Sequence, residues 1–431
     1  MKKIGLISLG CDKNTVDSES ILSLFKEPYF EISTKLEECD AIIINTCGFI
    51  LPAKEEAINT ILDCLKYENA KIIVCGCLVK RNLEELKESL PEVDLWISFK
   101  DYPRMLELVC NLLKVDIQND EFDIFKRRLS TKKFSAFLKI SEGCSNYCGF
   151  CAIPFIRGPY HSFDFDKIIN QAKEFASNGV KELIVISQDT GAYGKDFKDK
   201  NINLVTLLKE IEKIDGIEFI RVLYLYPEEV SDEYIEFVKN SKKMTHYFDI
   251  PIQHASNNVL KNMLRRDTKE SVENLFNKIK KEIPDVIFRT TLIVGYPTET
   301  EKDFNELKEF IKEYRFNHLG VFTYSKEEGT YGNTFKEQID EKIKEKRKEE
   351  IMKIQQEISY EKNKELIDKK FKAIVVSKSN NGYSVRCGIN APDDVDGSIY
   401  LKTDKDLNEG DIINIKITHA FVYDLYAEMV D

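Results

Sequence analysis

The feature that most constrains the fold is a repeated alternation of continuous apolar runs with helical patterns, which begins at the first residues of the chain. In the first 125 residues, apolar runs and the helical patterns that follow them lie at residues 2–10, 15–25, 40–47, 53–65, 71–77 and 81–90. Continuous apolar strands separated by helices are typical of a parallel sheet with both faces covered. The sequence therefore predicts an N-terminal parallel-sheet α/β domain over residues 1–125.

The alternation resumes on a larger scale after a polar, charged stretch at residues 119–133. Six apolar runs are the predicted strands, at residues 134–140, 182–187, 217–225, 246–252, 286–294 and 318–325. Each run but the last is followed by a helical pattern, which predicts a partial (β/α)6 barrel with functional residues at the carboxyl ends of its strands. We assign this barrel, with a long and mostly solvated helix that trails it, to residues 130–364.

The rest of the chain, residues 365–431, changes to short runs with a period of two residues, broken by Gly, Pro, Asn and Asp. This pattern predicts a small antiparallel β-barrel. The predicted fold class is therefore α/β with three domains, which suits a chain of 431 residues.

Composition argues against some classes of function. The formal net charge of -11 argues against a large non-specific nucleic-acid surface, because such surfaces depend on Lys and Arg. No apolar stretch approaches the length needed to cross a bilayer, so we expect a cytoplasmic protein with no membrane partner. Eleven cysteines in a reducing compartment favour metal binding or core packing over disulfides.

The stretch EGCSNYCGFCAIP, residues 142–154, places Cys144, Cys148 and Cys151 in one loop after the first barrel strand. Glycines and polar residues surround them, so packing alone is a poor explanation. Structural zinc prefers four ligands and often a C-x2-C pair, whereas the first pair here is C-x3-C and His161 lies ten residues beyond Cys151. An iron–sulfur cube held by three thiolates leaves one iron free to bind a small molecule, which explains a set of three.

Three more cysteines, Cys11, Cys47 and Cys77, each follow a predicted strand of the N-terminal domain. Loops at the carboxyl ends of neighbouring parallel strands converge on one edge of the sheet, where such sheets bind ligands. We therefore expect these cysteines to meet at one point, beside glycines that allow close approach: Gly10, Gly48 and Gly76. Cys75 competes with Cys77 because both face the same side, but its place inside the strand favours packing. The remaining four cysteines are assigned to packing.

The spacing C-x3-C-x2-C, with Phe150 before the last cysteine, resembles the radical S-adenosylmethionine (SAM) superfamily. This resemblance implies that Cys144, Cys148 and Cys151 hold a 4Fe-4S cluster whose open iron chelates SAM, with Phe150 near the adenine. Together the two triads resemble the methylthiotransferases, radical SAM enzymes with an N-terminal cluster domain and a C-terminal TRAM barrel, over essentially the whole chain. The segments SLGCDKNTVDSES, NTCGFI, LYLYP, FDIPIQHASNNVLKNMLRR and LIVGYPTETE are most similar to the branch that modifies ribosomal small-subunit protein S-twelve.

The resemblance also implies cofactors, partners and a reaction. Cys11, Cys47 and Cys77 would hold an auxiliary 4Fe-4S cluster, so two clusters and SAM are expected. A deoxyadenosyl radical would abstract hydrogen from the β-carbon of an aspartate in protein S-twelve, and a sulfur species methylated by another SAM would trap the carbon radical. Electrons would come from a donor such as flavodoxin or ferredoxin, and the expected state is a monomer.

Gly295 and Glu299 follow the fifth barrel strand, where relatives contact SAM, and are further candidates for SAM binding. Each has a structural alternative, because Gly295 can simply make the turn and Glu299 can start a helix, where a carboxylate suits the dipole. His254 could act near the substrate, but we interpret it as a structural histidine; Arg265 and Arg266 could grip a carboxylate, but on a helix we interpret them as solvated residues. No P-loop or dinucleotide glycine motif is present, which argues against nucleotide hydrolysis and hydride transfer.

Two other functions stay open. A tRNA methylthiotransferase of the same family would bind RNA through its TRAM barrel, but residues 371–431 carry six Lys plus Arg against ten Asp plus Glu. That balance makes a poor phosphate-binding surface and a better one for a basic ribosomal protein. A non-catalytic RNA- or protein-binding module with structural clusters would not cleave SAM.

Overall fold

The N-terminal sheet forms from the apolar runs of the sequence, and two short edge strands complete it. In the computed structural model, which describes residues 1–117, 121–379, 382–392 and 395–430, five parallel strands have the order β2-β1-β3-β4-β5. Their bounds are Lys2–Ser8 (β1), Phe30–Ile32 (β2), Ala41–Thr46 (β3), Lys71–Gly76 (β4) and Leu95–Ile97 (β5). The sequence did not predict β2 and β5. Residues 119 and 120 of the charged stretch, residue 118 before it and residue 431 lie outside the described residues.

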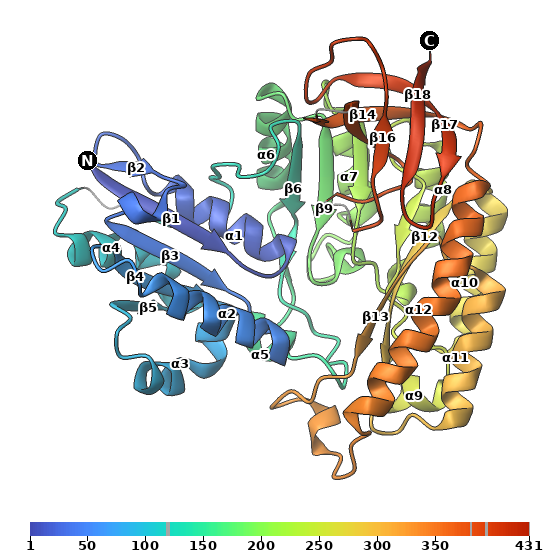
Figure 1. Ribbon diagram of the computed structural model, residues 1–431, viewed down its shortest axis with the longest axis horizontal. Coiled ribbons are helices and arrows are strands. Elements are labelled where there is room, and N and C mark those ends of the chain that lie inside the picture. The colour runs from blue at the N-terminus through green and yellow to red at the C-terminus, as the bar shows by residue number, and fades with distance from the viewer. Residues whose placement is uncertain (118–120, 380–381, 393–394, 431) are drawn as a thin grey trace.

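Helices cover both faces of this sheet, as the continuous apolar strands predict. They are α1 (Asp12–Ser23), α2 (Leu51–Cys64), α3 (Cys77–Ser89) and α4 (Met105–Leu113). One face of the sheet packs on residues of α1 and α4, and the other packs on α2 and α3. The N-terminal part of the chain is therefore a three-layer α/β unit, blue to cyan in Figure 1.

Six parallel strands form the central array. They are β6 (Ser135–Lys139), β9 (Glu182–Ile186), β10 (Phe219–Val222), β11 (Tyr247–Asp249), β12 (Ile287–Val294) and β13 (His318–Thr323). The order is β6-β9-β10 and then β11-β12-β13, and backbone bonds join the two halves: Leu225 N–H donates to Asp249 O (3.0 Å) and Thr245 N–H to Ile220 O (3.0 Å). The partial (β/α)6 barrel is confirmed.

Helices pack around the array, and two short strands enclose the cysteine loop. The helices are α5 (Ile153–Arg157), α6 (Phe165–Ser177), α7 (Leu204–Glu212), α8 (Asp232–Asn240), α9 (Asn257–Asn262), α10 (Lys269–Glu282) and α11 (Glu301–Tyr314). The two strands, β7 (Ser141–Glu142) and β8 (His161–Ser162), pair antiparallel. Short 3-10 helices lie at Leu36–Glu38, Phe99–Arg104, Thr190–Ala192, Pro227–Glu229 and Tyr331–Thr334.

The charged helix α12 (Glu341–Lys364) runs along the array beside α11 and leads into the C-terminal barrel (Figure 1). Its buried stripe includes Ile351 and Ile358, while Ile343 is exposed. Gln355 Nε2 donates to Phe316 O (2.9 Å), so polar as well as apolar residues attach it. The helix is charged on its solvent side and packed on the other.

The C-terminal strands close into a five-stranded barrel, β14-β15-β16-β18-β17. Their bounds are Lys370–Ser379 (β14), Gly382–Cys387 (β15), Ile399–Leu401 (β16), Ile412–Ala420 (β17) and Leu425–Val430 (β18). Four of the five pairings are antiparallel, and β16 with β18 is parallel. An odd number of strands cannot alternate in direction all the way around a ring, so one parallel pair is required.

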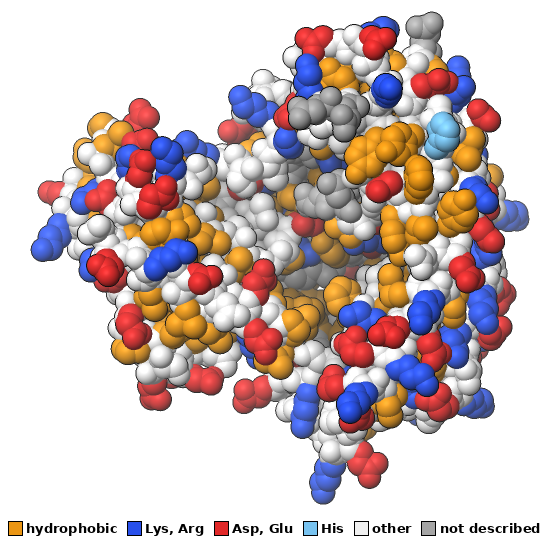
Figure 2. All heavy atoms as spheres, viewed as in Figure 1, with side chains coloured by type: hydrophobic (Ala, Val, Ile, Leu, Met, Phe, Trp, Pro, Cys, Tyr) orange, Lys and Arg blue, Asp and Glu red, His pale blue; other side chains and the backbone are white. Residues whose placement is uncertain are grey.

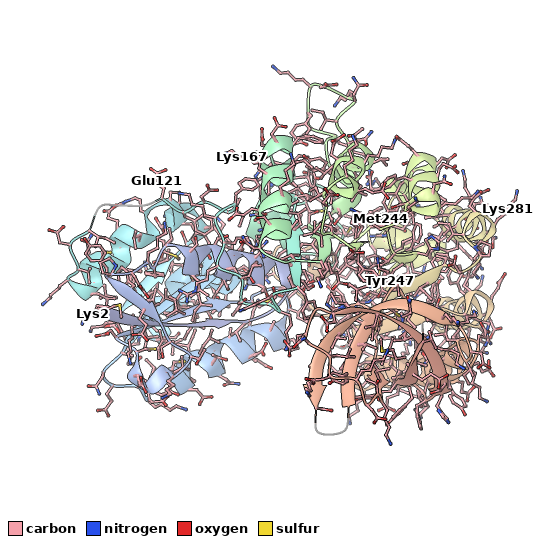
Figure 3. All side chains as sticks on the ribbon, turned by 90° about the horizontal axis from the view of Figure 1, so that it is seen from above. Lys2, Glu121, Lys167, Met244, Tyr247 and Lys281 are labelled. Atoms are coloured by element: carbon pink, nitrogen blue, oxygen red, sulfur yellow. The ribbon has the colours of Figure 1, made fainter. Side chains whose placement is uncertain are left out.

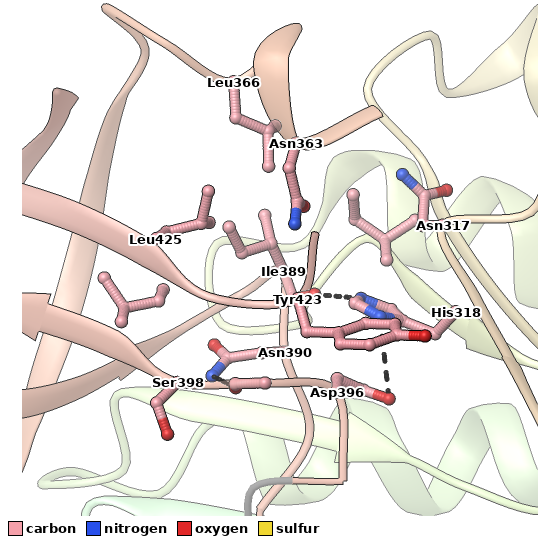
Figure 4. Close-up of a pocket in the computed structure, with 13 residues that line it drawn as sticks. Asn317, His318, Asn363, Leu366, Ile389, Asn390, Asp396, Ser398, Tyr423 and Leu425 are labelled. Carbon is pink, nitrogen blue, oxygen red and sulfur yellow. Dashed lines mark hydrogen bonds and ion pairs between the residues drawn. The ribbon is translucent and has the colours of Figure 1, made fainter. Parts of the chain in front are cut away.

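A buried polar contact fixes this barrel to the central array. Asp396 accepts hydrogen bonds from Tyr247 OH (2.5 Å) and from Ala391 N–H (2.8 Å). His318 Nε2 lies 2.8 Å from Ile389 O, and its Nδ1 lies 3.7 Å from Asp396 (Figure 4). Seen from above in Figure 3, Tyr247 lies where the barrel meets the array. Asp396 therefore links residues of both domains at this junction.

The face seen in Figure 2 is hollowed between the N-terminal domain and the rest of the molecule. Helix α1 spans this junction on the inside, because it packs on both the N-terminal sheet and β6. No helix in the described parts of the chain is both long and apolar enough to cross a membrane.

Candidate functional site

The structure places Cys11, Cys47 and Cys77 at the carboxyl ends of three neighbouring parallel strands. Cys11 is the residue before α1, Cys47 follows β3, and Cys77 is the first residue of α3. The strand ends are level, because Ser8 pairs with Asn45 and Thr46 pairs with Gly76. Three thiols far apart in sequence therefore share one edge of the sheet.

Two glycines allow these loops to touch. Gly10 has φ +89°, and a Cβ at this position would lie 2.7 Å from the Cβ of Cys47. Gly76 has φ +96°, and its Cβ would lie 2.4 Å from Oδ1 of Asn45. Any larger residue would be strained in conformation and would push the loops apart.

Asn14, in the first turn of α1, ties the same loops together. Its Nδ2 donates to Leu9 O (2.8 Å) and to Thr46 O (3.1 Å), and its backbone carbonyl accepts from Asn45 Nδ2 (3.0 Å). These buried bonds fix Cys11 relative to Cys47.

The second triad lies in the loop after β6. Within it, Cys151 N–H donates to Cys148 O (2.9 Å), and Cys144 N–H donates to Gly158 O (3.2 Å). Gly149 joins the loop to its surroundings, since its N–H donates to Met263 O (2.7 Å) and its carbonyl accepts from Gly332 N–H (2.6 Å). A cavity of about 270 Å³ is lined by Cys148 and Cys151 together with Tyr147, Phe155, Leu264 and Tyr331.

Arg265 lies beside this triad, and its interpretation as a solvated residue is wrong. Its guanidinium is buried, lies 3.8 Å from the centre of the Tyr226 ring and pairs with Asp267 (3.2 Å). Burial raises the pKa of Cys148, and Arg265 opposes that rise. Arg266 is half exposed and pairs with Glu228 (3.2 Å), as expected of a surface arginine.

Arg157 connects the two triads. It ends α5, six residues after Cys151, and its Nη2 donates to Cys77 Sγ (3.3 Å) and to Asn14 Oδ1 (2.7 Å). Its Nη1 pairs with Asp17 (2.5 Å) on α1. A side chain from the loop region of one triad therefore bonds a thiol of the other.

The charges around Arg157 form a buried network. Lys139 Nζ, at the end of β6, pairs with Asp17 (2.8 Å) and with Glu142 (2.6 Å). Burial opposes ionisation of Glu142, but the Lys139 ammonium and the Arg157 guanidinium hold its pKa below the usual range. Both cations are thus neutralised by carboxylates of this network.

The segment after β10 reaches both triads. Tyr226 stacks on Arg265, beside Cys148. Two residues earlier, Tyr224 OH donates to Asp12 Oδ2 (2.8 Å), and the Lys13 ammonium lies 3.1 Å from the centre of the Tyr224 ring. The two tyrosines therefore span the distance between the N-terminal and barrel cysteines.

In the absence of metal, burial disfavours the thiolate form of five of these cysteines. Burial raises the pKa of Cys77 and of Cys144 to about 11, and it raises those of Cys47, Cys148 and Cys151 as well. A coordinating metal reverses this effect by stabilising the thiolates. Within the described residues, no group of three or more His, Cys, Asp or Glu side chains surrounds a single point for one metal ion. In an iron–sulfur cube each thiolate has its own iron.

Buried polar atoms without partners cluster near the ends of β6 and β9. Among the described residues, these unpartnered atoms are Ser141 Oγ, Tyr160 OH, Gln188 Oε1 and Asp189 Oδ1. Burial raises the pKa of Asp189 to about 6, although Asn146 Nδ2 donates to its other oxygen (2.7 Å). Buried polar atoms are normally hydrogen-bonded, so this group suits a polar ligand.

The three residues expected to contact SAM have different surroundings. Phe150 is half-buried and packs on an apolar cluster that contains Tyr296. Gly295 has φ +79° and turns the chain after β12, and its N–H donates to the Glu299 carboxylate. Glu299 lies before the N-cap of α11, so it does not begin that helix. Its Oε1 lies 3.4 Å from Arg347.

His254 is buried near Glu299, and its Nδ1 accepts from Ser256 N–H (3.0 Å), which agrees with a structural histidine. Its Nε2 lies 4.0 Å from the Glu299 carboxylate. The functional side chains Asn14, Arg157 and Asp189 were not predicted from the sequence. Asn14 lies within the segment SLGCDKNTVDSES, three residues after Cys11, whereas Arg157 and Asp189 carried no signal beyond their position close behind a cysteine or a strand end.

Known proteins agree with this architecture. Three family models match: uncharacterized protein family UPF0004 at residues 3–98, the radical SAM superfamily at residues 138–311 and the TRAM domain at residues 367–430. Among solved structures, the radical SAM methyltransferase TsrM from Kitasatospora setae has a TM-score of 0.57 at 12% identity, covering 74% of this chain and 73% of that chain. A six-stranded array with the three-cysteine loop after its first strand defines a radical SAM enzyme.

Curated relatives show to which family of radical SAM enzymes the chain belongs. Proteins named ribosomal protein uS12 methylthiotransferase RimO are 44% identical in Acetivibrio thermocellus, covering 100% of this chain and 99% of that protein, and 46% identical in Alkaliphilus oremlandii, covering 99% and 98%. A relative of the same name in Clostridium botulinum is 45% identical over 98% of this chain and 97% of its own length. The chain belongs to the RimO family of radical SAM methylthiotransferases.

Proposed function

We propose that this enzyme adds a methylthio group to the β-carbon of an aspartate in ribosomal protein uS12. The observation that carries the proposal is the pairing of two cysteine triads, joined by the Arg157 bond to Cys77 Sγ (3.3 Å). The relatives, all named ribosomal protein uS12 methylthiotransferase, cover 98–100% of the chain. In the reaction, a C–H bond of the aspartate is replaced by a C–S bond, and the methyl group comes from a second SAM.

Cys144, Cys148 and Cys151 are assigned to the cluster that binds SAM. When bound there, the cluster supplies the electron that breaks a sulfonium bond of SAM and produces the radical that removes hydrogen from the substrate. The cavity lined by Cys148 and Cys151 and the unpartnered polar atoms near β6 and β9 support a polar ligand at this place. Phe150 and Gly295 would contact SAM, and Glu299 would act as a positioning residue through its bond to the Gly295 N–H.

Cys11, Cys47 and Cys77 are assigned to the auxiliary cluster, which would supply sulfur close to the substrate. Asn14 holds two of the loops together, and Arg157 donates to the third thiol. Hydrogen bonds to ligand sulfurs orient them and adjust the potential of a cluster. The residues present therefore fit a second cluster.

The C-terminal barrel favours uS12 over tRNA. Residues 371–431 carry six Lys plus Arg against ten Asp plus Glu. A negative surface repels phosphates but attracts a basic ribosomal protein. As further parts of this proposal, a small one-electron carrier such as flavodoxin or ferredoxin reduces the enzyme, which acts as a cytoplasmic monomer.

Mass spectrometry of uS12 and of bulk tRNA, from cells with and without this gene, tests the substrate. The expected result is a methylthio mass on uS12 that disappears when the gene is deleted, with unchanged tRNA. Loss of a methylthio mass from tRNA alone would assign the enzyme to RNA. SAM cleavage without any methylthio product on either molecule would refute both assignments.

Iron analysis tests the two triads separately. The anaerobically reconstituted wild type should hold about eight irons per chain, and Cys77→Ala and Cys148→Ala should each hold about four. Cys77→Ala should still cleave SAM, whereas Cys148→Ala should not. Cys110→Ala, a buried cysteine on α4, is the matched control and should keep about eight. A wild type with only four irons would contradict the auxiliary cluster.

A further inference from the structure

Lys13 is a buried cation without a carboxylate partner. It is 8% exposed, and in the described parts of the chain no carboxylate oxygen lies within ion-pair distance of its Nζ. Its ammonium contacts the face of Tyr224 instead, 3.1 Å from the ring centre. Removing a charge from water without a partner is costly, so the position favours the arrival of an anion.

The other buried cations of the site differ in this respect. Arg157 and Lys139 both pair with Asp17, and Arg265 pairs with Asp267. These side chains are occupied by the protein's own carboxylates. Lys13 is therefore the cation of this group that can accept a carboxylate without breaking an existing ion pair.

Tyr224 holds the two acidic side chains near Lys13. The Tyr224 hydroxyl donates to Asp12 Oδ2 (2.8 Å), and the Tyr224 backbone N–H donates to Asp249 Oδ2 (2.9 Å). Tyr224 thereby fixes both carboxylates while its ring contacts Lys13. The arrangement keeps the ammonium next to the acids without pairing it to either one.

Lys13 also lies between the two triads. It is two residues after Cys11, in the first turn of α1. Its partner Tyr224 is two residues before Tyr226, which stacks on Arg265 beside Cys148. A group bound at Lys13 would therefore lie along the wall that joins the N-terminal cysteines to the barrel cysteines.

We propose that the Lys13 ammonium binds the side-chain carboxylate of the aspartate that receives the methylthio group. This inference rests on the proposed function. In aspartate the β-carbon is bonded directly to the carboxylate carbon, so a cation that holds the carboxylate also positions the reacting C–H bond. An adenosine base carries no carboxylate, so Lys13 also selects the protein substrate against tRNA.

Binding measurements with matched substrates test this role. The cluster-loaded full chain is titrated, without reductant, with uS12 that has either the target aspartate or asparagine in its place. Enzymes are the wild type, Lys13→Met, Lys13→Arg and the control Lys66→Met. Lys66 is an exposed lysine of the same domain whose Nζ lies 5.3 Å from the centre of the Tyr67 ring. Iron content and SAM cleavage without substrate report whether each variant is intact.

The wild type and Lys66→Met should bind the aspartate form at least about 30-fold more tightly than the asparagine form. Asparagine removes the negative charge that pairs with Lys13, and removing one partner of a buried charge pair weakens binding by about this factor or more. Lys13→Met should bind both forms equally, and Lys13→Arg should keep a preference. The inference would be overturned if the wild type bound the aspartate and asparagine forms equally, or if Lys13→Met kept the full preference for the aspartate form. If Lys13→Met loses iron, Lys13→Gln is judged by the same comparison.

The result is separable from the proposed function. If the wild type modifies uS12 but prefers the aspartate form no more than Lys13→Met does, the proposed function stands and only the role of Lys13 is refuted. A wild type that cleaves SAM but never modifies uS12 removes the function itself.

Discussion

At the scale of single residues, the site depends on Arg157, which lies outside every motif named from the sequence. Arg157 donates to Cys77 Sγ (3.3 Å) and to Asn14 Oδ1 (2.7 Å), and pairs with Asp17 (2.5 Å). These partners come from α1 and α3, far from Arg157 in sequence. One arginine thus sets the relative position of both cysteine groups.

Asp189 gives a pH-dependent prediction. Burial, assisted by Glu229, raises its pKa to about 6 from an ordinary value of 3.8. Because the folded state disfavours the charged carboxylate, stability falls as pH rises from about 4 to about 6, and the full loss is about 3 kcal/mol above that range. Asp189→Asn should remove this loss.

Thermal unfolding of iron-free protein between about pH 4 and pH 8 checks the prediction, since cluster loss at low pH then contributes nothing. The melting temperature of Asp189→Asn should equal that of the wild type near pH 4 and exceed it above pH 6. Parallel curves for the two proteins would mean that Asp189 titrates normally.

The cysteines could be read from the sequence, and their neighbours could not. Spacing in one loop and position after strands singled out six thiols, because both are local features. The contacts of Arg157 with Asn14 and Cys77, and of Lys13 with Tyr224, depend on how two domains meet, which no local pattern encodes. Arg265 was expected in solvent because its place in a helical pattern does not reveal the long-range contacts with Tyr226 and Cys148 that bury it.

At the scale of elements, α1 has an unusual environment. Nine of its twelve residues are buried, including the polar Asn14, Asp17 and Glu19. They are buried because α1 lies between the sheet and the barrel, where Asp17 pairs with Lys139 (2.8 Å) and Glu19 pairs with Arg127. The helix is held by ion pairs on one side and by apolar packing on the other.

Asp17→Ala should loosen this attachment. The substitution leaves Arg157 and Lys139 with less negative charge in a buried place, and breaking such a pair costs about 3–5 kcal/mol. Hydrogen exchange should rise in both α1 and β6. As a control, Glu210→Ala removes an exposed pair with Lys213 (2.5 Å) and should leave exchange unchanged. Normal exchange in α1 of Asp17→Ala would contradict the assigned role of the network.

Long elements were predicted well, and most short strands were missed. The three inner strands of the N-terminal sheet and all six strands of the array follow from apolar runs. The strands β2, β5 and β16 have three residues each, too few to show a period. The equally short β11 was predicted because its apolar run continues to residue 252. Helix α3 begins at Cys77, earlier than the pattern from residue 81 suggested, because its first turn is apolar and buried against the sheet.

At the scale of the whole molecule, charge separates the two candidate substrates. The chain has a net charge of -11, and its last 61 residues are acidic on balance. Complementary charge speeds the encounter with a basic protein and is screened by salt. The same charge slows the approach of a polyanion.

The association rate of this enzyme with uS12 should therefore fall when salt is raised from about 50 to 300 mM, by about tenfold or more. The rate with tRNA should stay low at both concentrations. Stopped-flow or surface binding experiments measure both rates. A salt-independent uS12 rate would show that the charge of the C-terminal barrel has no part in recognition.

The position of α1 has a consequence for inheritance. A hybrid enzyme that joins this N-terminal domain to the barrel of a distant relative would bury Asp17 and Glu19 of α1 at an interface without basic partners. Arg127, Lys139 and Arg157 would have to be transferred together with α1. Although three family models divide the chain, its first two modules are expected to descend as a single unit.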